Sequence, residues 1–123
     1  MRKVILVLCI AAGLSSCYNR KASDLYPVAT TTCDTTTSTY SGTVLPIMRQ
    51  HCAITGCHTG SSPANGLAYD KYAGIAVVAQ NGQLIQAIEH SGSVVPMPLN
   101  LPMLDQCSID KIVRWVNLGY QNN

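Results

Sequence analysis

Neither positive nor negative charge predominates in this chain. Its eight Lys and Arg residues exceed its six Asp and Glu residues by two, which gives a formal net charge of +2. Arg2 and Lys3 account for that excess, since residues 17–123 carry six charges of each sign. The sequence therefore lacks the basic patch of a nucleic-acid-binding protein, and we expect no nucleic-acid partner.

An apolar run long enough to span a membrane is also lacking. The basic start of the chain precedes an apolar stretch, residues 4–14, that has the length of the apolar part of a secretory signal. Residues 14–17 read Leu-Ser-Ser-Cys and resemble the bacterial lipobox. This predicts a signal peptide over residues 1–16 and a lipid anchor on Cys17. An ordinary signal peptide followed by a chance cysteine is the alternative.

Residues 17–39 are rich in threonine and have no helical period. Such a segment cannot bury enough apolar surface to order itself, so we expect a lipidated, disordered tether. Retention in the inner membrane is associated with an aspartate directly after the lipidated cysteine. This chain has Tyr18 at that position, so the outer membrane is favoured in a Gram-negative cell.

Apolar residues recur at helical spacing in residues 40–123 and predict one small all-α domain. The first helix presents a face with the i, i+3, i+4, i+7 spacing from Val44 to His51. Ser41 or Thr43 can cap its start. The helix would end where a pair of cysteines begins.

Two short helices are expected in the middle of the domain. The first covers residues 70–78 and is interrupted near Gly74, because glycine is a poor helix former. The second covers residues 81–90, with Asn81 as its cap.

The closing helix has the clearest pattern. An apolar stripe runs from Ile109 to Val116, Ser108 can cap its start, and Gly119 is suited to the position just past its end. Residues 91–102 contain Gly92 and three prolines, and must form a loop.

Residues 52–58 read Cys-Ala-Ile-Thr-Gly-Cys-His. Two thiols followed directly by an imidazole can fasten a haem, with thioethers from Cys52 and Cys57 and an iron ligand from His58. The familiar Cys-x-x-Cys-His motif has two residues between the cysteines, whereas this chain has four. Gly56 permits the backbone angles that such a bulge requires. The motif predicts one covalently bound haem c.

Other uses of these side chains are less well supported. A zinc site needs four ligands, and no second cysteine pair is available nearby. A disulfide between Cys52 and Cys57 would leave His58 without a role. A thioredoxin-like site would need two intervening residues within a βαβ pattern.

Haem attachment would leave Cys33 and Cys107 as the remaining pair, because Cys9 lies in the signal and Cys17 carries the lipid. An exported protein is in a compartment where a disulfide between them can persist. Four cysteines allow three pairings, and only the haem motif selects this one.

Met97 is the expected second axial ligand. It lies between Pro96 and Pro98, whose rings fix φ and stiffen the backbone on both sides. A thioether ligand stabilises ferrous iron and raises its reduction potential. His90 and Met103 are the alternative ligands.

Four other residues have less specific expectations. Met48 lies on the first helix and is expected in the core. His51 would contact solvent or a haem propionate. Tyr69 and Trp115 could donate to a propionate, but ordinary core packing is the simpler reading.

Taken together, residues 40–120 resemble small bacterial monohaem cytochrome c domains. The matching elements are the helix ending at the haem cysteines, residues 66–70, Met97-Pro98 and the closing helix with Ile112, Val113, Trp115 and Gly119. The resemblance implies a class I-like cytochrome c fold in which His58 and Met97 are the axial ligands of the haem iron.

The resemblance also implies an electron carrier rather than an enzyme. It would exchange electrons with redox partner proteins while anchored in the bacterial cell envelope. Two alternatives remain: a five-coordinate haem sensor or peroxidase-like protein, and a structural lipoprotein stapled by disulfides without a cofactor.

Overall fold

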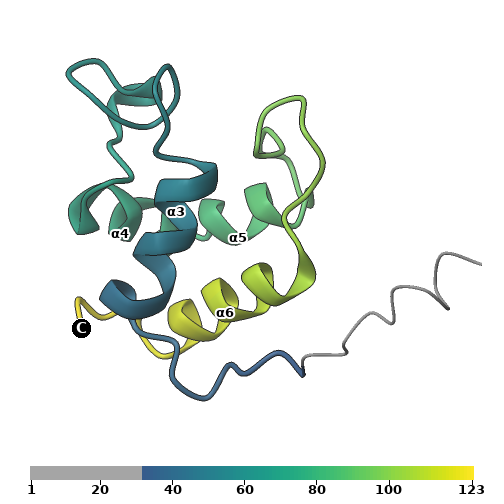
Figure 1. Cartoon of the computed structure of the whole chain (residues 1–123). Helices are drawn as coiled ribbons and strands as arrows, with labels where there is room; N and C mark the ends of the chain where they lie inside the picture. Colours follow the sequence, from purple (N-terminus) through teal and green to yellow (C-terminus); the bar gives the residue numbers. More distant parts are fainter. Residues whose placement is uncertain (1–31) are drawn as a thin grey trace, which may run out of the picture. The chain divides into compact units, whose positions relative to one another are not determined.

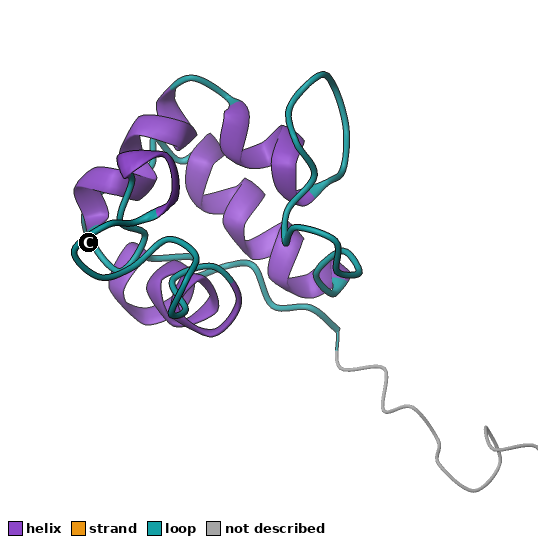
Figure 2. Cartoon of the chain, turned by 90° about the horizontal axis from the view of Figure 1, so that it is seen from above, coloured by secondary structure: helices purple, strands orange, loops and turns teal. Residues whose placement is uncertain are grey.

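The computed structural model describes residues 32–123, so the predicted signal peptide, Cys17 and most of the predicted tether lie outside the described residues. Residues 32–123 are helical and contain no strand, which confirms the all-α prediction (Figure 1, Figure 2). The helical segments are η1 (Tyr40–Val44, a π-helical turn), α3 (Leu45–His51), η2 (Ala64–Gly66, a 3₁₀ turn), α4 (Tyr72–Gln80), α5 (Gln83–Ile88) and α6 (Gln106–Asn117). None of these helices is both long enough and apolar enough to cross a membrane.

The first helical segment begins earlier than its apolar stripe. Thr39 is extended, and its side-chain oxygen accepts a hydrogen bond from the backbone N–H of Gly42 at 3.2 Å. The predicted caps Ser41 and Thr43 both lie inside η1, so that prediction is wrong. Tyr40 is buried together with Val44, and the helical turn therefore begins at Tyr40, before the predicted caps.

α4 is continuous, and the predicted interruption near Gly74 is wrong. A methyl group at this position would collide with the carbonyl group of Ala68, lying 2.8 Å from its carbon. Gly74 therefore allows the helix to pack directly against the backbone of the preceding segment.

α5 is shorter than predicted and follows a tight turn. Gly82 has a left-handed φ of 78°, which turns the chain between α4 and α5. The side-chain oxygen of Asn81 accepts a hydrogen bond from the N–H of Gln83 at 3.0 Å. The N-cap of α5 is Gly82, so the prediction of Asn81 as the cap is wrong, although Asn81 binds the first N–H of the helix from one position earlier.

α6 begins at Gln106, and its N-cap is Asp105 rather than the predicted Ser108. Ser108 is the third residue of the helix and donates both its N–H (3.0 Å) and its hydroxyl (2.6 Å) to the Asp105 carboxylate. The hydrogen bond from the hydroxyl lowers the pKa of Asp105 most, and the bond from the N–H lowers it further. The helix was predicted to start too late, because the prediction followed the apolar stripe and the first turn of α6 lies before that stripe.

The end of α6 is as predicted. Gly119 is left-handed (φ 92°), and its N–H bonds to the carbonyl of Val116 at 2.9 Å. The N–H of Tyr120 bonds to the carbonyl of Trp115 at 3.0 Å, which completes a Schellman motif.

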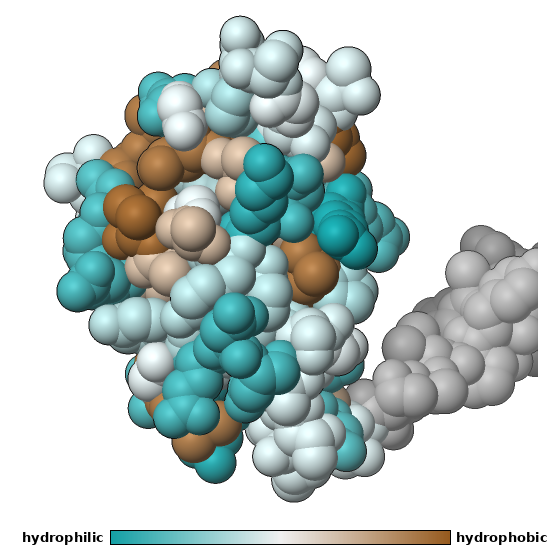
Figure 3. All heavy atoms as spheres, turned by 90° about the vertical axis from the view of Figure 1, so that its left-hand side faces the viewer, coloured by the Kyte–Doolittle hydropathy of each residue, from teal (hydrophilic) through white to brown (hydrophobic). Residues whose placement is uncertain are grey.

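One hydrophobic core joins the helices. η1 packs against α6, α4 against α5, and α5 against α6. Trp115 is 1% exposed and donates to the carbonyl of Gln121 at 2.9 Å, so it is a core residue. Met48 is fully buried, as predicted. On the face drawn in Figure 3, hydrophobic residues occur in separate patches between polar ones.

A disulfide joins Cys33 to Cys107 in the first turn of α6, with an S–S distance of 2.09 Å. The compact unit of the structure runs from Cys33 to Asn123. It thus includes residues 33–39, which composition places in the tether, and Ser38 within them is only 4% exposed.

Candidate functional site

A cavity of about 580 Å³ opens between the end of α3, α5 and the loops before α4 and α6. This volume lies in the range of small-molecule and cofactor sites, roughly 300–1,000 Å³. No Asp, Glu, Lys or Arg lines the cavity. Four aliphatic side chains both line it and are exposed, so they form an apolar rim: Ile54, Val95, Leu99 and Leu101.

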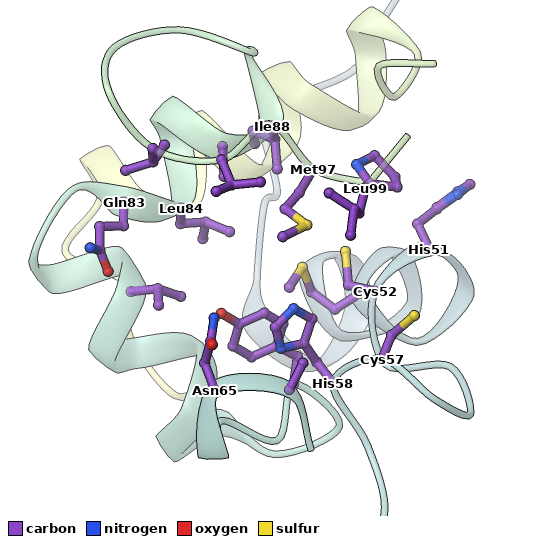
Figure 4. A pocket seen from close by; sticks show the side chains of 18 of the residues that line it. His51, Cys52, Cys57, His58, Asn65, Gln83, Leu84, Ile88, Met97 and Leu99 are labelled. Atoms are coloured by element: carbon purple, nitrogen blue, oxygen red, sulfur yellow. The ribbon is translucent and has the colours of Figure 1, made fainter. Parts of the chain in front are cut away.

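His58 enters the cavity from below in the close view, with its ring edge directed into the space (Figure 4). The residue is only 6% exposed. Its Nδ1 lies 3.3 Å from the carbonyl oxygen of Leu67. Because a carbonyl only accepts, Nδ1 carries the proton, and Nε2 keeps its lone pair for the cavity. Histidine ligands of metals are commonly oriented by such a bond.

Tyr69 has a role at the site that the sequence did not predict. Its ring stacks on that of His58, with centroids 4.0 Å apart and planes 18° from parallel. The N–H of Tyr69 also donates to the carbonyl of His58 at 2.8 Å. The segment from Leu67 to Tyr69 therefore fixes the imidazole by its plane, its Nδ1 and its backbone. Aromatic character at position 69 was the only available signal, and it does not distinguish stacking from core packing.

The two thiols of the motif lie at the same cavity but differ in exposure. Cys52 is partly buried at the end of α3, whereas Cys57 is exposed, and the two are not bonded to each other. Burial, together with the nearby Cys57 thiol, raises the pKa of Cys52 to about 11. The Cys52 thiol points towards the cavity in Figure 4, while the Cys57 thiol lies towards its outer edge.

The four residues between the thiols form a closed bulge. Gly56 has a left-handed φ of 85°, as expected for this position. The N–H of Cys57 bonds to the carbonyl of Ile54 at 3.0 Å, and the N–H of His58 bonds to the carbonyl of Cys52 at 3.1 Å. The second bond returns the chain to the end of α3, and both thiols and the imidazole line the same cavity despite the longer spacing.

Met97 enters the cavity from the side opposite His58, with its sulfur directed inwards (Figure 4). Its N–H donates to the carbonyl of Ala87 at 2.9 Å, and its carbonyl lies 3.1 Å from Nε2 of His90. The Met97-Pro98 peptide bond is cis.

The alternative ligands lie elsewhere. Met103 is 46% exposed and does not line the cavity. His90 is exposed, and its Nε2 is occupied by the Met97 carbonyl. His51 lies at the cavity edge and its ring points outwards in Figure 4.

Within residues 32–123, no three or more His, Cys, Asp or Glu side chains come together to hold a metal ion. No protein-family model, no curated protein and no solved structure matches this chain.

Proposed function

We propose that this chain is a monohaem c-type cytochrome that transfers electrons. In this proposal Cys52 and Cys57 form thioethers with one haem, and His58 and Met97 are the axial ligands of its iron. The observation that carries the proposal is that His58 and Met97 enter one uncharged cavity from opposite sides. Both thiols of the motif lie at that same cavity.

The donor set fits a haem better than it fits a free metal ion. A lone imidazole and a thioether do not complete a tetrahedral site, whereas a haem supplies four nitrogen ligands and leaves two axial positions. The apolar lining suits a flat macrocycle, and the exposed rim leaves one edge accessible to a partner.

When bound, haem supplies the one-electron Fe(III)/Fe(II) chemistry. The residues of this chain hold the ligands in place. Leu67 and Tyr69 fix the imidazole of His58, and the soft sulfur of Met97 favours the ferrous state. With both His58 and Met97 bound to it, the iron would have no open position for a substrate, which favours electron transfer over catalysis.

The location proposed for this carrier is the bacterial cell envelope. A lipid on Cys17 would anchor the domain, with the outer membrane favoured, and residues 18–32 would give it reach towards redox partner proteins. Export is in keeping with the Cys33–Cys107 disulfide, which an oxidising compartment preserves.

The decisive experiment is production in cells that have haem-maturation machinery, followed by haem staining of a denaturing gel. We expect a stained band at the mass of residues 17–123 with their lipid and haem. Cys52→Ser and Cys57→Ser each remove one thioether, which the pyridine haemochrome spectrum reports. A chain that is exported and folded without stain contradicts the proposal and favours the structural lipoprotein.

The axial assignment has its own test. The oxidised protein should have a sulfur-to-iron charge-transfer band, and Met97→Ala should abolish it. Met103→Ala is the matched control and should retain the band. A protein with covalent haem but no such band would instead be a five-coordinate sensor or a peroxidase-like protein.

A further inference from the structure

Both polar groups of the Met97 backbone are bound, one by α5 and the other by the turn that follows it. The N–H of Met97 donates to the carbonyl of Ala87 at 2.9 Å. On the other side, Nε2 of His90 lies 3.1 Å from the Met97 carbonyl, and because a carbonyl only accepts, the imidazole is the donor. One of these bonds is between main-chain groups, and the other depends on the side chain of His90.

The chain around His90 is shaped to bring this imidazole to Met97. His90 has a left-handed φ of 51°, a region in which histidine is enriched among non-glycine residues. The N–H of Ser91 bonds back to the carbonyl of Gln86 at 2.9 Å. The side chain of Gln86 packs so closely over Gly92 that a methyl group there would meet it. These contacts reverse the chain after α5 and return it to Met97.

We propose that His90 is a positioning residue for Met97, which keeps the thioether in the cavity by tying the Met97 carbonyl to α5. This inference rests on the proposed function and adds a residue to it. Without the imidazole, the backbone of Met97 would keep only the bond from its N–H to Ala87. Met97 would then leave the iron more often.

The expected size follows from the strength of one hydrogen bond. An ordinary neutral bond of this kind changes an equilibrium by roughly 2- to 12-fold. The fraction of molecules with Met97 released should rise by that factor when the donor is lost. Added imidazole reports this fraction, since it binds the ferric iron only after Met97 has left.

The experiment compares imidazole affinity in the ferric holoprotein at one fixed pH. His90→Leu removes the donor, and we expect imidazole to bind roughly 2- to 12-fold more tightly. His90→Gln keeps an N–H donor at a similar reach and should restore an affinity close to that of the parent. Glu89→Gln changes the neighbouring exposed side chain and serves as the control without effect.

Backbone strain has to be separated from the lost hydrogen bond. A left-handed φ is unfavourable for leucine but not for glycine. His90→Gly therefore removes the donor and relieves the strain together. If the donor matters, His90→Gly shares the tighter imidazole binding of His90→Leu. If it restores the affinity of the parent, strain was the cause and the proposal is overturned.

A second measurement does not depend on iron ligation. Hydrogen exchange of the Met97 amide, which bonds to Ala87, should be faster in His90→Leu and His90→Gly than in the parent and in Glu89→Gln. The proposed function fails if the parent lacks covalent haem or the sulfur-to-iron band. The His90 inference fails if the parent has covalent haem and the sulfur-to-iron band but His90→Leu and His90→Gly bind imidazole with the affinity of the parent. It also fails if the Met97 amide exchanges at the same rate in these two variants as in the parent.

Discussion

Gly74→Ala gives the sharpest test of how the fold positions the site. Gly74 lies in α4 against the backbone of Ala68, the central residue of the segment that holds His58. A methyl group there would strike a main-chain carbonyl, which cannot rotate away as a side chain could. Either α4 or residues 67–69 must move.

Two opposing effects decide the outcome. Replacing glycine by alanine inside a helix favours folding by about 1 kcal/mol. Overpacking a filled site costs about 1–3 kcal/mol, and contact with backbone places this case in the upper part of that range. We therefore expect Gly74→Ala to lower the free energy of unfolding by about 1–2 kcal/mol. In a domain of this size that loss corresponds to a drop of about 4–16 °C in Tm.

Thermal and urea unfolding measure the effect, followed by circular dichroism of the helices. Ala73→Gly is the matched control, because Ala73 is the exposed neighbour in the same helix. It should lose about 1 kcal/mol through helix propensity alone. If Gly74→Ala is as stable as the parent or more stable, the close packing of α4 on Ala68 is refuted.

The remaining predictions concern the disulfide, the N-cap of α6 and the two free thiols. Cys107→Ser removes the disulfide to Cys33, which closes a loop with a sequence separation of 74, and should lower the free energy of unfolding by about 4 kcal/mol, as measured by urea titration. Asp105→Ala removes the N-cap of α6 and should cost about 1 kcal/mol at neutral pH. Hydrogen bonds lower the pKa of Asp105, so the carboxylate stabilises the fold above pH 4. This stabilisation is lost as the pH falls through the lowered pKa. Asp105→Asn should remove the part of the acid-induced loss of stability that comes from this carboxylate. In the haem-free chain, iodoacetamide should modify the exposed Cys57 before Cys52, whose pKa is raised to about 11, and peptide mass mapping measures the order. Burial of the neutral Cys52 thiol also means that stability of this form should fall as the pH rises from about 9 through 11.

Each of these has an outcome that contradicts it. Equal urea midpoints for Cys107→Ser and the oxidised parent would mean that the disulfide does not constrain the chain. Identical acid unfolding of Asp105→Asn and the parent would remove the capping explanation. Equal alkylation rates for the two thiols would contradict the burial of Cys52.

The sequence predicted the helical class and the end of α6 at Gly119, but it misplaced the N-caps of the helices. Gly119 was predictable because only a residue that tolerates a left-handed φ fits after α6. The starts of η1 and α6 were less predictable. Both helices begin before their apolar stripes, where Thr39 and Asp105 compete with other capping residues nearby.

Gly74 was misjudged for a different reason. In the sequence a glycine inside a helix indicates a break, because its propensity is low. In the structure its neighbour is the backbone of Ala68, and such a tertiary contact leaves no periodic mark.

The candidate site divides in the same way. Spacing along the chain identified Cys52, Cys57 and His58, and the flanking prolines identified Met97. The sequence could not assign Tyr69 or His90 to these ligands, because their contacts depend on how two loops return to the cavity. The left-handed φ of His90 is likewise a property of the folded loop.

The turn between α4 and α5 connects the two helices against which the candidate ligands are held. The segment that holds His58 packs on α4 through Gly74, and the backbone of Met97 is bound by the end of α5. The two candidate ligands are thus attached to consecutive helices joined only by Asn81 and Gly82. In the proposed cytochrome, this two-residue turn and the packing of α4 against α5 would together set the distance between the two ligands.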